Sequence, residues 1–283
     1  MNNIVVIGIG LIGGSMVKDL KKVHPATKII GVDTNADHVN QALVSGLIDE
    51  KGTLDSVKNA DLVILSIPVD ASVALLPEIL DLVSDDTLVI DVGSTKLDVC
   101  HKVEHHINRR NYLSCHPIAG TEFSGPQAAI NGLFKDKTNI ICEVEKTAFK
   151  LQESALRVFS DLGMRIRYMN PESHDKHIAY VSHLSHISSF MLGKTVIDKE
   201  RNERDIFDMA GSGFASTVRL AKSSPNMWTP IFKQNKTNVI ETLDEYINNL
   251  NQFKILLEKD DFEAIFNEMK NTNRIKDILK GIA

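Results

Sequence analysis

The chain has 283 residues, of which 43% are hydrophobic and 24% are charged, and its formal net charge at pH 7 is −5. The length predicts two domains, and the composition is that of an ordinary globular protein. The acidic balance, without a clustered basic stretch, excludes a nucleic-acid-binding protein, and no apolar run approaches the ~20 residues of a membrane span.

Three cysteines without paired spacing (Cys100, Cys115 and Cys142) are typical of a reducing compartment. The first residues enter a strand pattern directly, without the features of a secretory signal. We therefore expect a cytoplasmic protein.

The first half of the chain alternates strand and helix patterns. Near-continuous apolar runs, which are typical of strands buried on both faces, occupy residues 3–8, 28–33, 62–68, 87–93 and 112–117. Helix-compatible stretches occupy 15–23, 36–45, 71–82 and 147–162, and further strands are expected at 139–142 and 165–169. This order predicts an α/β fold with a doubly wound parallel (Rossmann) sheet.

The first strand runs into a glycine-rich turn, G-I-G-L-I-G, from Gly8 to Gly13. Between a buried strand and a helix, this pattern is the fingerprint of dinucleotide binding. Gly8 permits the tight turn, Gly10 lets the backbone approach a pyrophosphate, and Gly13 allows close helix packing. Leu11 and Ile12 open a helix whose N-terminus favours an anion. A purely structural glycine turn remains the alternative.

Asp33, at the end of the second strand, selects the kind of dinucleotide. Its carboxylate can accept hydrogen bonds from the adenosine ribose but would repel a 2′-phosphate. No arginine among the next three residues could hold that phosphate. The sequence therefore predicts NAD rather than NADP, with Ser66 and Pro68 beside it because ligands bind at the carboxyl ends of such strands.

A histidine stands at another strand end, in the stretch S-C-H-P-I-A-G-T-E-F-S-G-P (114–126). Because this loop would face the nicotinamide, we expect His116 to act as a general base rather than to occupy a surface turn. An ordinary histidine pKa near 6.5 would suit that role at neutral pH.

The second half is predicted to be helical. Asn170 and Pro171 form a helix start, and the helix runs towards Lys194. At 100° per residue, a polar stripe forms on one face, with His183 beside it: Ser182, His186, Ser189 and Gly193. The stripe indicates a lined cleft. Core histidines remain an alternative, and no metal is expected because a third ligand is missing.

Downstream, Gly211 and Gly213 predict a turn, and Arg219 lies about two helical turns further on, where a guanidinium could clamp a substrate carboxylate. A long helix is expected from Asn226, with an apolar stripe between Val239 and Leu257. Because this stripe exceeds what a small domain can cover, we expect it to build a homodimer.

With these motifs in place, the chain resembles the prephenate/arogenate dehydrogenase family of tyrosine biosynthesis over nearly its whole length. The resemblance is carried by GIGLIGGS (8–15), DVGSTK (91–96), HPIAGTE (116–122), SHLSH (182–186) and the Gly-Phe…Arg219 segment. It implies a Rossmann domain at 1–169, a helical substrate and dimerisation domain at 170–283, and NAD-dependent oxidative decarboxylation of prephenate to 4-hydroxyphenylpyruvate.

The resemblance also implies residue roles. His116 matches the catalytic histidine that accepts the hydrogen bond of the ring hydroxyl. Ser94 matches a serine that contacts both this histidine and the ring hydroxyl. Arg219 matches the arginine that binds a carboxylate of prephenate. Other residues expected around the substrate are His183, His186, Thr121, Glu122 and Trp228. Ser216 replaces an acidic residue that many members carry, so the orientation of Arg219 is open.

Three alternatives remain. Arogenate could replace prephenate as the substrate. The chain could be another two-domain NAD(P)-dependent hydroxyacid dehydrogenase, but those generally use a lysine in the helical domain, where this helix offers only Lys194 at its far end. A non-catalytic NAD sensor would not need His116, Ser94 and Arg219.

Overall fold

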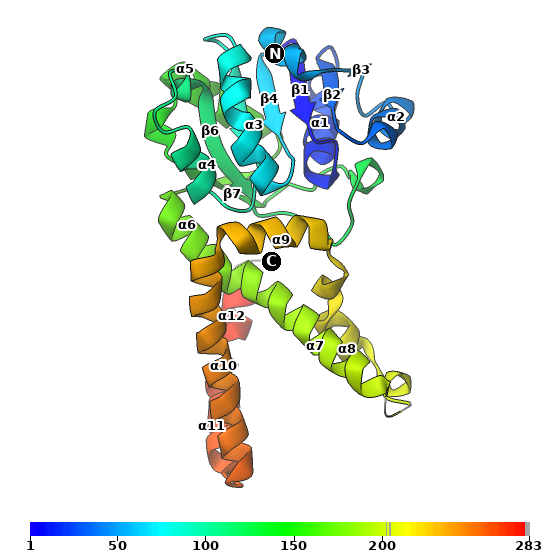
Figure 1. Cartoon of the computed structure of the whole chain (residues 1–283), viewed down its shortest axis with the longest axis vertical. Coiled ribbons are helices and arrows are strands. Elements are labelled where there is room, and N and C mark those ends of the chain that lie inside the picture. Colours follow the sequence, from blue (N-terminus) through cyan, green and yellow to red (C-terminus); the bar gives the residue numbers. More distant parts are fainter. Residues whose placement is uncertain (202, 204, 281–283) are drawn as a thin grey trace. The chain divides into compact units, whose positions relative to one another are not determined.

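The computed structural model describes residues 1–201, 203 and 205–280, in two compact units, Met1–Lys236 and Thr237–Ala283. The first unit contains one sheet (Figure 1) of order β3-β2-β1-β4-β5-β6-β7-β8. The strands are β1 Asn3–Ile7, β2 Lys28–Val32, β3 Glu50–Lys51, β4 Leu62–Leu65, β5 Leu88–Asp91, β6 Tyr112–Pro117, β7 Thr138–Cys142 and β8 Arg165–Met169.

The pairing of these strands confirms the predicted parallel, doubly wound sheet. All neighbours are parallel except β6 and β7, which run antiparallel with His116 opposite Ile140. The sequence pattern did not indicate this reversal or the two-residue strand β3. The carboxyl ends of β1, β4, β5 and β6 therefore lie along one edge, where ligands of such sheets bind.

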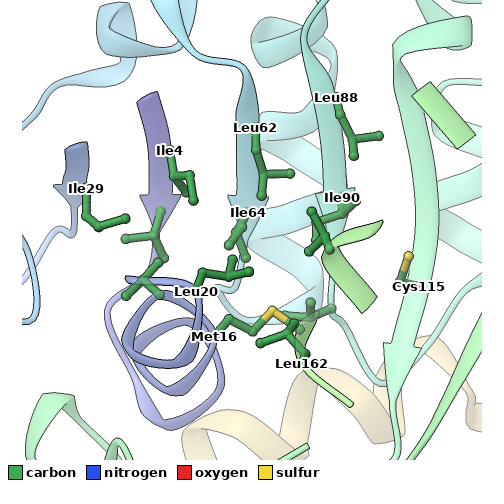
Figure 2. Close-up of a cluster of buried hydrophobic side chains, with 14 of the residues drawn as sticks. Ile4, Met16, Leu20, Ile29, Leu62, Ile64, Leu88, Ile90, Cys115 and Leu162 are labelled. Carbon is green, nitrogen blue, oxygen red and sulfur yellow. The ribbon is translucent and has the colours of Figure 1, made fainter. Parts of the chain in front are cut away.

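Helices cover both faces of the sheet, and the strand side chains alternate between them. The helices are α1 Leu11–Val23, α2 Ala36–Val44, α3 Val69–Leu82, α4 Leu97–Lys102 and α5 Phe149–Asp161. On one face Ile4 and Ile64 lie in a buried cluster with Met16 of α1 (Figure 2). On the other face Val5 and Val63 pack in a second cluster with α3 and α4. This two-sided burial explains the continuous apolar runs.

A long helical segment follows β8. It consists of α6 Pro171–Ile178, a π-helical turn Ala179–His183 and α7 Leu184–Glu200. The Asn170 side chain accepts a hydrogen bond from the Ser173 N–H, so the predicted helix start is confirmed. The π turn inserts an extra residue, so the predicted 100° spacing does not hold between the residues before and after it.

Two predictions about the following helices are wrong. Gly213 lies inside α8 Ser212–Thr217 rather than in a turn, with Gly211 as the residue before the helix. The expected long helix from Asn226 is two helices, α9 Pro225–Gln234 and α10 Lys236–Glu258, separated at Asn235. The buried Asn235 side chain donates to the carbonyl oxygen of Asp175 in α6 at 2.6 Å.

The second unit contains most of α10, with α11 Phe262–Thr272 and α12 Ile275–Lys280. The proposed domain boundary at residue 169 coincides with the end of β8, whereas the first compact unit continues to Lys236. No helix in the described ranges is long and apolar enough to cross a membrane.

Candidate active site

The glycine-rich turn after β1 is packed too tightly for side chains. Gly8 has a φ of +92°, and a Cβ there would lie 2.2 Å from the Ser66 carbonyl oxygen at the end of β4. A Cβ on Gly13 would lie 2.4 Å from the Gly8 carbonyl oxygen. The glycines at both positions therefore let α1 start directly against the strand ends.

The space in front of this turn is open. A Cβ on Gly10 would meet no atom within 4 Å, and Gly10 supplies no side-chain cap to α1. The first N–H groups of a helix lack intrahelical partners, so those of Leu11 and Ile12 can bind an anion. The Gly13 N–H donates to Ser66 Oγ at 3.0 Å, and Pro68 precedes α3 at the same edge. This cradle fits a pyrophosphate.

Asp33 lies beside this cradle, after β2. Its carboxylate accepts hydrogen bonds from the backbone N–H groups of Ile9 (3.0 Å) and Asn35 (2.8 Å), which fix its orientation. His38 Nδ1 lies 3.5 Å from Asp33 Oδ2, a neighbour that the sequence pattern did not indicate. The carboxylate keeps further lone pairs for ribose hydroxyls.

His116 closes β6 and forms the start of a hydrogen-bonded chain. Its Nδ1 lies 2.8 Å from His174 Nε2, and His174 Nδ1 lies 2.7 Å from Asp175 Oδ1. The two Asp175 oxygens accept the N–H groups of Lys96 and Leu97 at 2.8 and 3.0 Å. The sequence pattern did not indicate His174 and Asp175, although both follow a capped helix start and lie on the buried side of α6.

The two histidines of this hydrogen-bonded series, His116 and His174, are neutral. Burial, together with the neighbouring His174 and the charge on Lys96, lowers the pKa of His116 well below 6.5. Burial also lowers the pKa of His174, although Asp175 opposes the shift. The ordinary pKa expected for His116 is therefore wrong, because the sequence pattern indicated neither its burial nor the second histidine.

A buried ion pair supports β6 behind His116. The fully buried Lys96 ammonium group donates to the Asp91 carboxylate and to the Cys115 carbonyl oxygen, and Tyr112 donates to the other Asp91 oxygen at 2.7 Å. The two opposite charges thereby compensate each other, as buried charges must. The pair ties β5 to β6, the strand that carries His116.

A second group consists of His183 at the end of the π-helical turn, His186 of α7 and Trp228 of α9. The His186 ring stacks on Trp228 with centroids 3.6 Å apart, and His183 packs edge-on at 5.7 Å. His183 Nδ1 accepts from Asn235 Nδ2 at 3.1 Å, so its proton is on Nε2. His183 Nε2 and Trp228 Nε1 are buried without a hydrogen-bond partner among the described residues, which leaves two donors for a ligand oxygen.

Trp228 also connects this group to the sheet edge. It packs in one buried cluster with Ile231 and with Val69, the first residue of α3. Figure 1 shows α9 lying along the edge at which the parallel strands end.

Arg219 and Glu122 are brought together as an ion pair. Arg219 Nη1 donates to Glu122 Oε2 at 3.1 Å, and the arginine side chain is half exposed. The Glu122 backbone N–H and the arginine hold the pKa of this carboxyl below its usual range. Ser216 Oγ donates to the Gly213 carbonyl oxygen, so it does not orient the guanidinium, and Thr121 Oγ1 accepts from the Phe123 N–H.

Ser94 lies in the loop after β5, and in the described part of the chain no hydrogen bond joins it to His116; its role stays a prediction. Across the described ranges, no group of three or more His, Cys, Asp or Glu side chains could hold a metal ion.

A dinucleotide cradle and a neutral buried histidine, both at carboxyl ends of strands of one parallel sheet, define a nucleotide-binding oxidoreductase of the Rossmann class. Comparison with known proteins narrows this class. Residues 16–168 match the family model "prephenate dehydrogenase, nucleotide-binding domain", and residues 170–271 match "prephenate dehydrogenase, dimerization domain". The chain belongs to the prephenate dehydrogenase family.

Individual relatives agree with this assignment. The prephenate dehydrogenase of Bacillus subtilis is 31% identical over 98% of this chain and 76% of its own length. Prephenate dehydrogenase from Aquifex aeolicus, solved with hydroxyphenyl propionate and NAD+, is 34% identical, covers 98% of both chains and has a TM-score of 0.87. Synechocystis arogenate dehydrogenase is 26% identical over 97% of this chain and 99% of its own, with a TM-score of 0.76. These findings support NAD as the cofactor.

Proposed function

We propose that this chain catalyses the NAD-dependent oxidative decarboxylation of prephenate to 4-hydroxyphenylpyruvate. The observation that carries the proposal is the state of His116: a buried, neutral imidazole at the end of β6, held through Nδ1 and with Nε2 left for a substrate. A neutral imidazole nitrogen at a ligand-binding sheet edge is suited to accept the proton of a hydroxyl group.

The residues around the glycine-rich turn fit the cofactor. The backbone at Gly10 and the start of α1 would hold the pyrophosphate, and Asp33 would accept the ribose hydroxyls. NAD, when bound, takes up the hydride of the carbinol carbon. Ser66 and Pro68 lie at the same edge and would flank it.

The protein itself contributes the transfer of one proton to the reaction. His116 Nε2 accepts the proton of the ring hydroxyl as the carbinol C–H bond breaks. The bond between the ring and the departing carboxylate then breaks, its electrons complete the aromatic ring, and the proton returns to the phenolic oxygen. The products are 4-hydroxyphenylpyruvate, carbon dioxide and NADH, so no net proton is released.

Arg219 supplies the positive charge that this dianionic substrate requires. Its guanidinium would clamp a substrate carboxylate in two hydrogen bonds, a geometry that suits arginine. The Glu122 contact holds the guanidinium in the absence of substrate, and Thr121 lies next to it in the same loop. The orphaned donors on His183 and Trp228, with His186 stacked on the latter, would bind the polar oxygens of the side chain. Ser94 would contact the ring hydroxyl.

We further propose that the active form is a homodimer. The described part of the second unit exposes many large apolar side chains, among them Ile247, Leu250, Phe253, Phe262 and Phe266. A surface of this kind marks an interface. The family model for residues 170–271, described as a dimerisation domain, agrees. A cytoplasmic location stays a prediction.

Arogenate is the second candidate substrate, favoured by the likeness to the Synechocystis arogenate dehydrogenase. The two compounds differ only where prephenate carries a side-chain carbonyl and arogenate an amine, and both present the ring hydroxyl to His116.

The deciding experiment is NADH formation at 340 nm with purified protein, NAD and either prephenate or arogenate, repeated with NADP. Turnover of prephenate with NAD is the expected result. Turnover of arogenate alone would keep the mechanism and change the substrate, and no turnover with either would overturn the proposal.

A further inference from the structure

We propose that His174 and Asp175 are positioning residues that fix the proton of His116 on Nδ1 and so keep the lone pair of Nε2 directed at the substrate. This inference rests on the proposed function of His116. It follows from the direction of the hydrogen bonds in the buried chain that joins the three side chains.

The direction is set at Asp175. Its Oδ1 accepts the N–H of Lys96 and its Oδ2 accepts the N–H of Leu97. An ionised carboxylate has only lone pairs to offer to a third partner, so at 2.7 Å the Nδ1 of His174 must be the donor. The opposite arrangement would place two lone pairs against each other in a buried site, where an unmade polar contact is costly.

The direction of the hydrogen bond between His174 and His116 follows from that of the bond between Asp175 and His174. Burial lowers the pKa of His174, so the ring carries a single proton, and that proton is on Nδ1. Its Nε2 therefore has a lone pair and accepts from His116 Nδ1–H at 2.8 Å. His116 is neutral as well, which leaves its Nε2 unprotonated. Two successive neutral imidazoles thus carry the polarity of a carboxylate to the reacting nitrogen.

The exposures of the residues agree with these roles. Asp175 and His174 are buried, at 3% and 2% exposure, and His116 retains 8%. Across the described ranges no protein atom bonds to His116 Nε2, and that atom is not among the buried polar atoms without a partner. In the hydrogen-bonded series from Asp175 to His116, the accessible end is thus His116, which would meet the substrate. Lys96 does not compete, because its ammonium group is bound to Asp91 and the Cys115 carbonyl.

The first test measures the tautomer of His116 directly and needs no turnover. Full-length protein labelled with ¹⁵N at histidine is examined by long-range ¹H–¹⁵N correlation, and the His116 signals are assigned by their loss in His116→Asn. We expect Nδ1 protonated and Nε2 unprotonated in the wild type. A proton on Nε2 would overturn the inference, whether or not prephenate is turned over.

The second test uses a matched pair of variants at position 174. The Gln side chain of His174→Gln can place an acceptor oxygen where Nε2 stands, whereas His174→Leu keeps the apolar volume and removes the acceptor. We expect kcat to fall by about 10²-fold in His174→Leu, with KM for NAD and prephenate changed less than about threefold, and to recover to within about tenfold of wild type in His174→Gln. Equal losses in the two variants would mean a packing role and would overturn the inference.

The third variant, Asp175→Leu, removes the acceptor that fixes the His174 proton on Nδ1. Without this acceptor His174 can carry its proton on Nε2, and the His116 proton then moves to the substrate side. We expect the NMR spectrum to show His116 protonated on Nε2 in part of the molecules and kcat to fall about 10²-fold or more. A folded Asp175→Leu protein with only the wild-type tautomer of His116 would contradict the proposed role of Asp175. If the wild type turns over neither substrate, the proposed function fails, and the spectra still decide the tautomer.

Discussion

The glycine-rich turn and the histidine site (His116, His174 and Asp175, with His183) are built in different ways. The turn is local: Gly8 and Gly13 are five residues apart, and at each a Cβ would lie within 2.4 Å of a backbone atom. The histidine site is assembled from distant segments, since His116 and His174 are 58 residues apart and meet only because α6 follows β8.

This difference determines how each region tolerates change. The turn depends on the close approach of backbone atoms, so an added methyl group disturbs folding and binding together. The histidine site depends on which nitrogen atoms carry protons, so a substitution that keeps every contact can still abolish turnover. The following predictions separate these two kinds of dependence.

The largest effect is expected from His116→Asn. The Asn amide can replace Nδ1–H and keep the contact with His174, whereas the base at Nε2 is lost. We predict that kcat falls by roughly 10²–10⁴-fold with little change in KM. Steady-state kinetics with both substrates measure this, and His105→Asn, at an exposed position, serves as the control. A large KM effect at unchanged kcat would remove His116 from its assigned role.

The next effect distinguishes two glycines of the turn. Gly8→Ala forces a Cβ against the Ser66 carbonyl oxygen at a φ of +92°, so we expect a lower Tm and NAD binding weakened by about 10–100-fold, because such strain costs ~1–3 kcal/mol. Gly10→Ala adds a methyl group in open space. It should leave the Tm of the free protein unchanged and still weaken NAD binding by about tenfold or more.

Calorimetric titration with NAD and thermal unfolding without it measure both glycine variants. Wild-type NAD affinity in Gly10→Ala would show that the pyrophosphate does not approach this backbone.

A smaller effect is expected at Arg219, whose side chain is half exposed. Arg219→Ala should raise KM for prephenate about 10–100-fold, the value of one lost charge-assisted contact of ~1.5–3 kcal/mol, with kcat nearly unchanged. Lys222→Ala removes an exposed cation three residues away and should have little effect. If the two variants behaved alike, a general electrostatic attraction would replace the specific clamp.

The same contrast explains how far the sequence could predict the molecule. The order of strands, the glycine-rich turn and Asp33 follow from local periodicity and spacing, and the bounds of β6 and β8 match the expected ranges. His116 could be placed at a strand end, but His174 and Asp175 could not be connected to it. Their contact depends on the packing of α6 against α4, for which no local pattern exists.

Two local features also misled the sequence-based reading. The π turn at Ala179–His183 shifts the helix phase, and a single-period wheel cannot anticipate it. Asn235 sits in a continuous helical pattern, yet its side chain bonds to the Asp175 carbonyl of another helix, and the helix divides there. Both features lie at the histidine site, where His183 ends the π turn and contacts Asn235, and there tertiary contacts override local preference.

The last expected effect concerns the free energy of unfolding at acidic pH, and it arises from buried histidines of the histidine site. Burial lowers the pKa of His183 from 6.5 to about 4, and the pKa values of His116 and His174 are lowered as well. The unfolded chain binds protons at these sites below pH 6.5 while the folded chain does not. The free energy of unfolding is therefore fully maintained above pH 6.5 and falls as the pH decreases from 6.5 towards 4.

Denaturant unfolding at several pH values, compared between wild type and His183→Gln, measures the share of one histidine. The stability advantage of wild type should shrink by on the order of 3 kcal/mol between pH 7 and pH 4, because each pKa unit corresponds to ~1.4 kcal/mol. Gly10→Ala should show no such pH-dependent difference, since the turn contains no titrating group with a lowered histidine pKa. A difference that stayed constant with pH would mean that His183 binds its proton over the same pH range in the folded and in the unfolded chain, so burial would not lower its pKa.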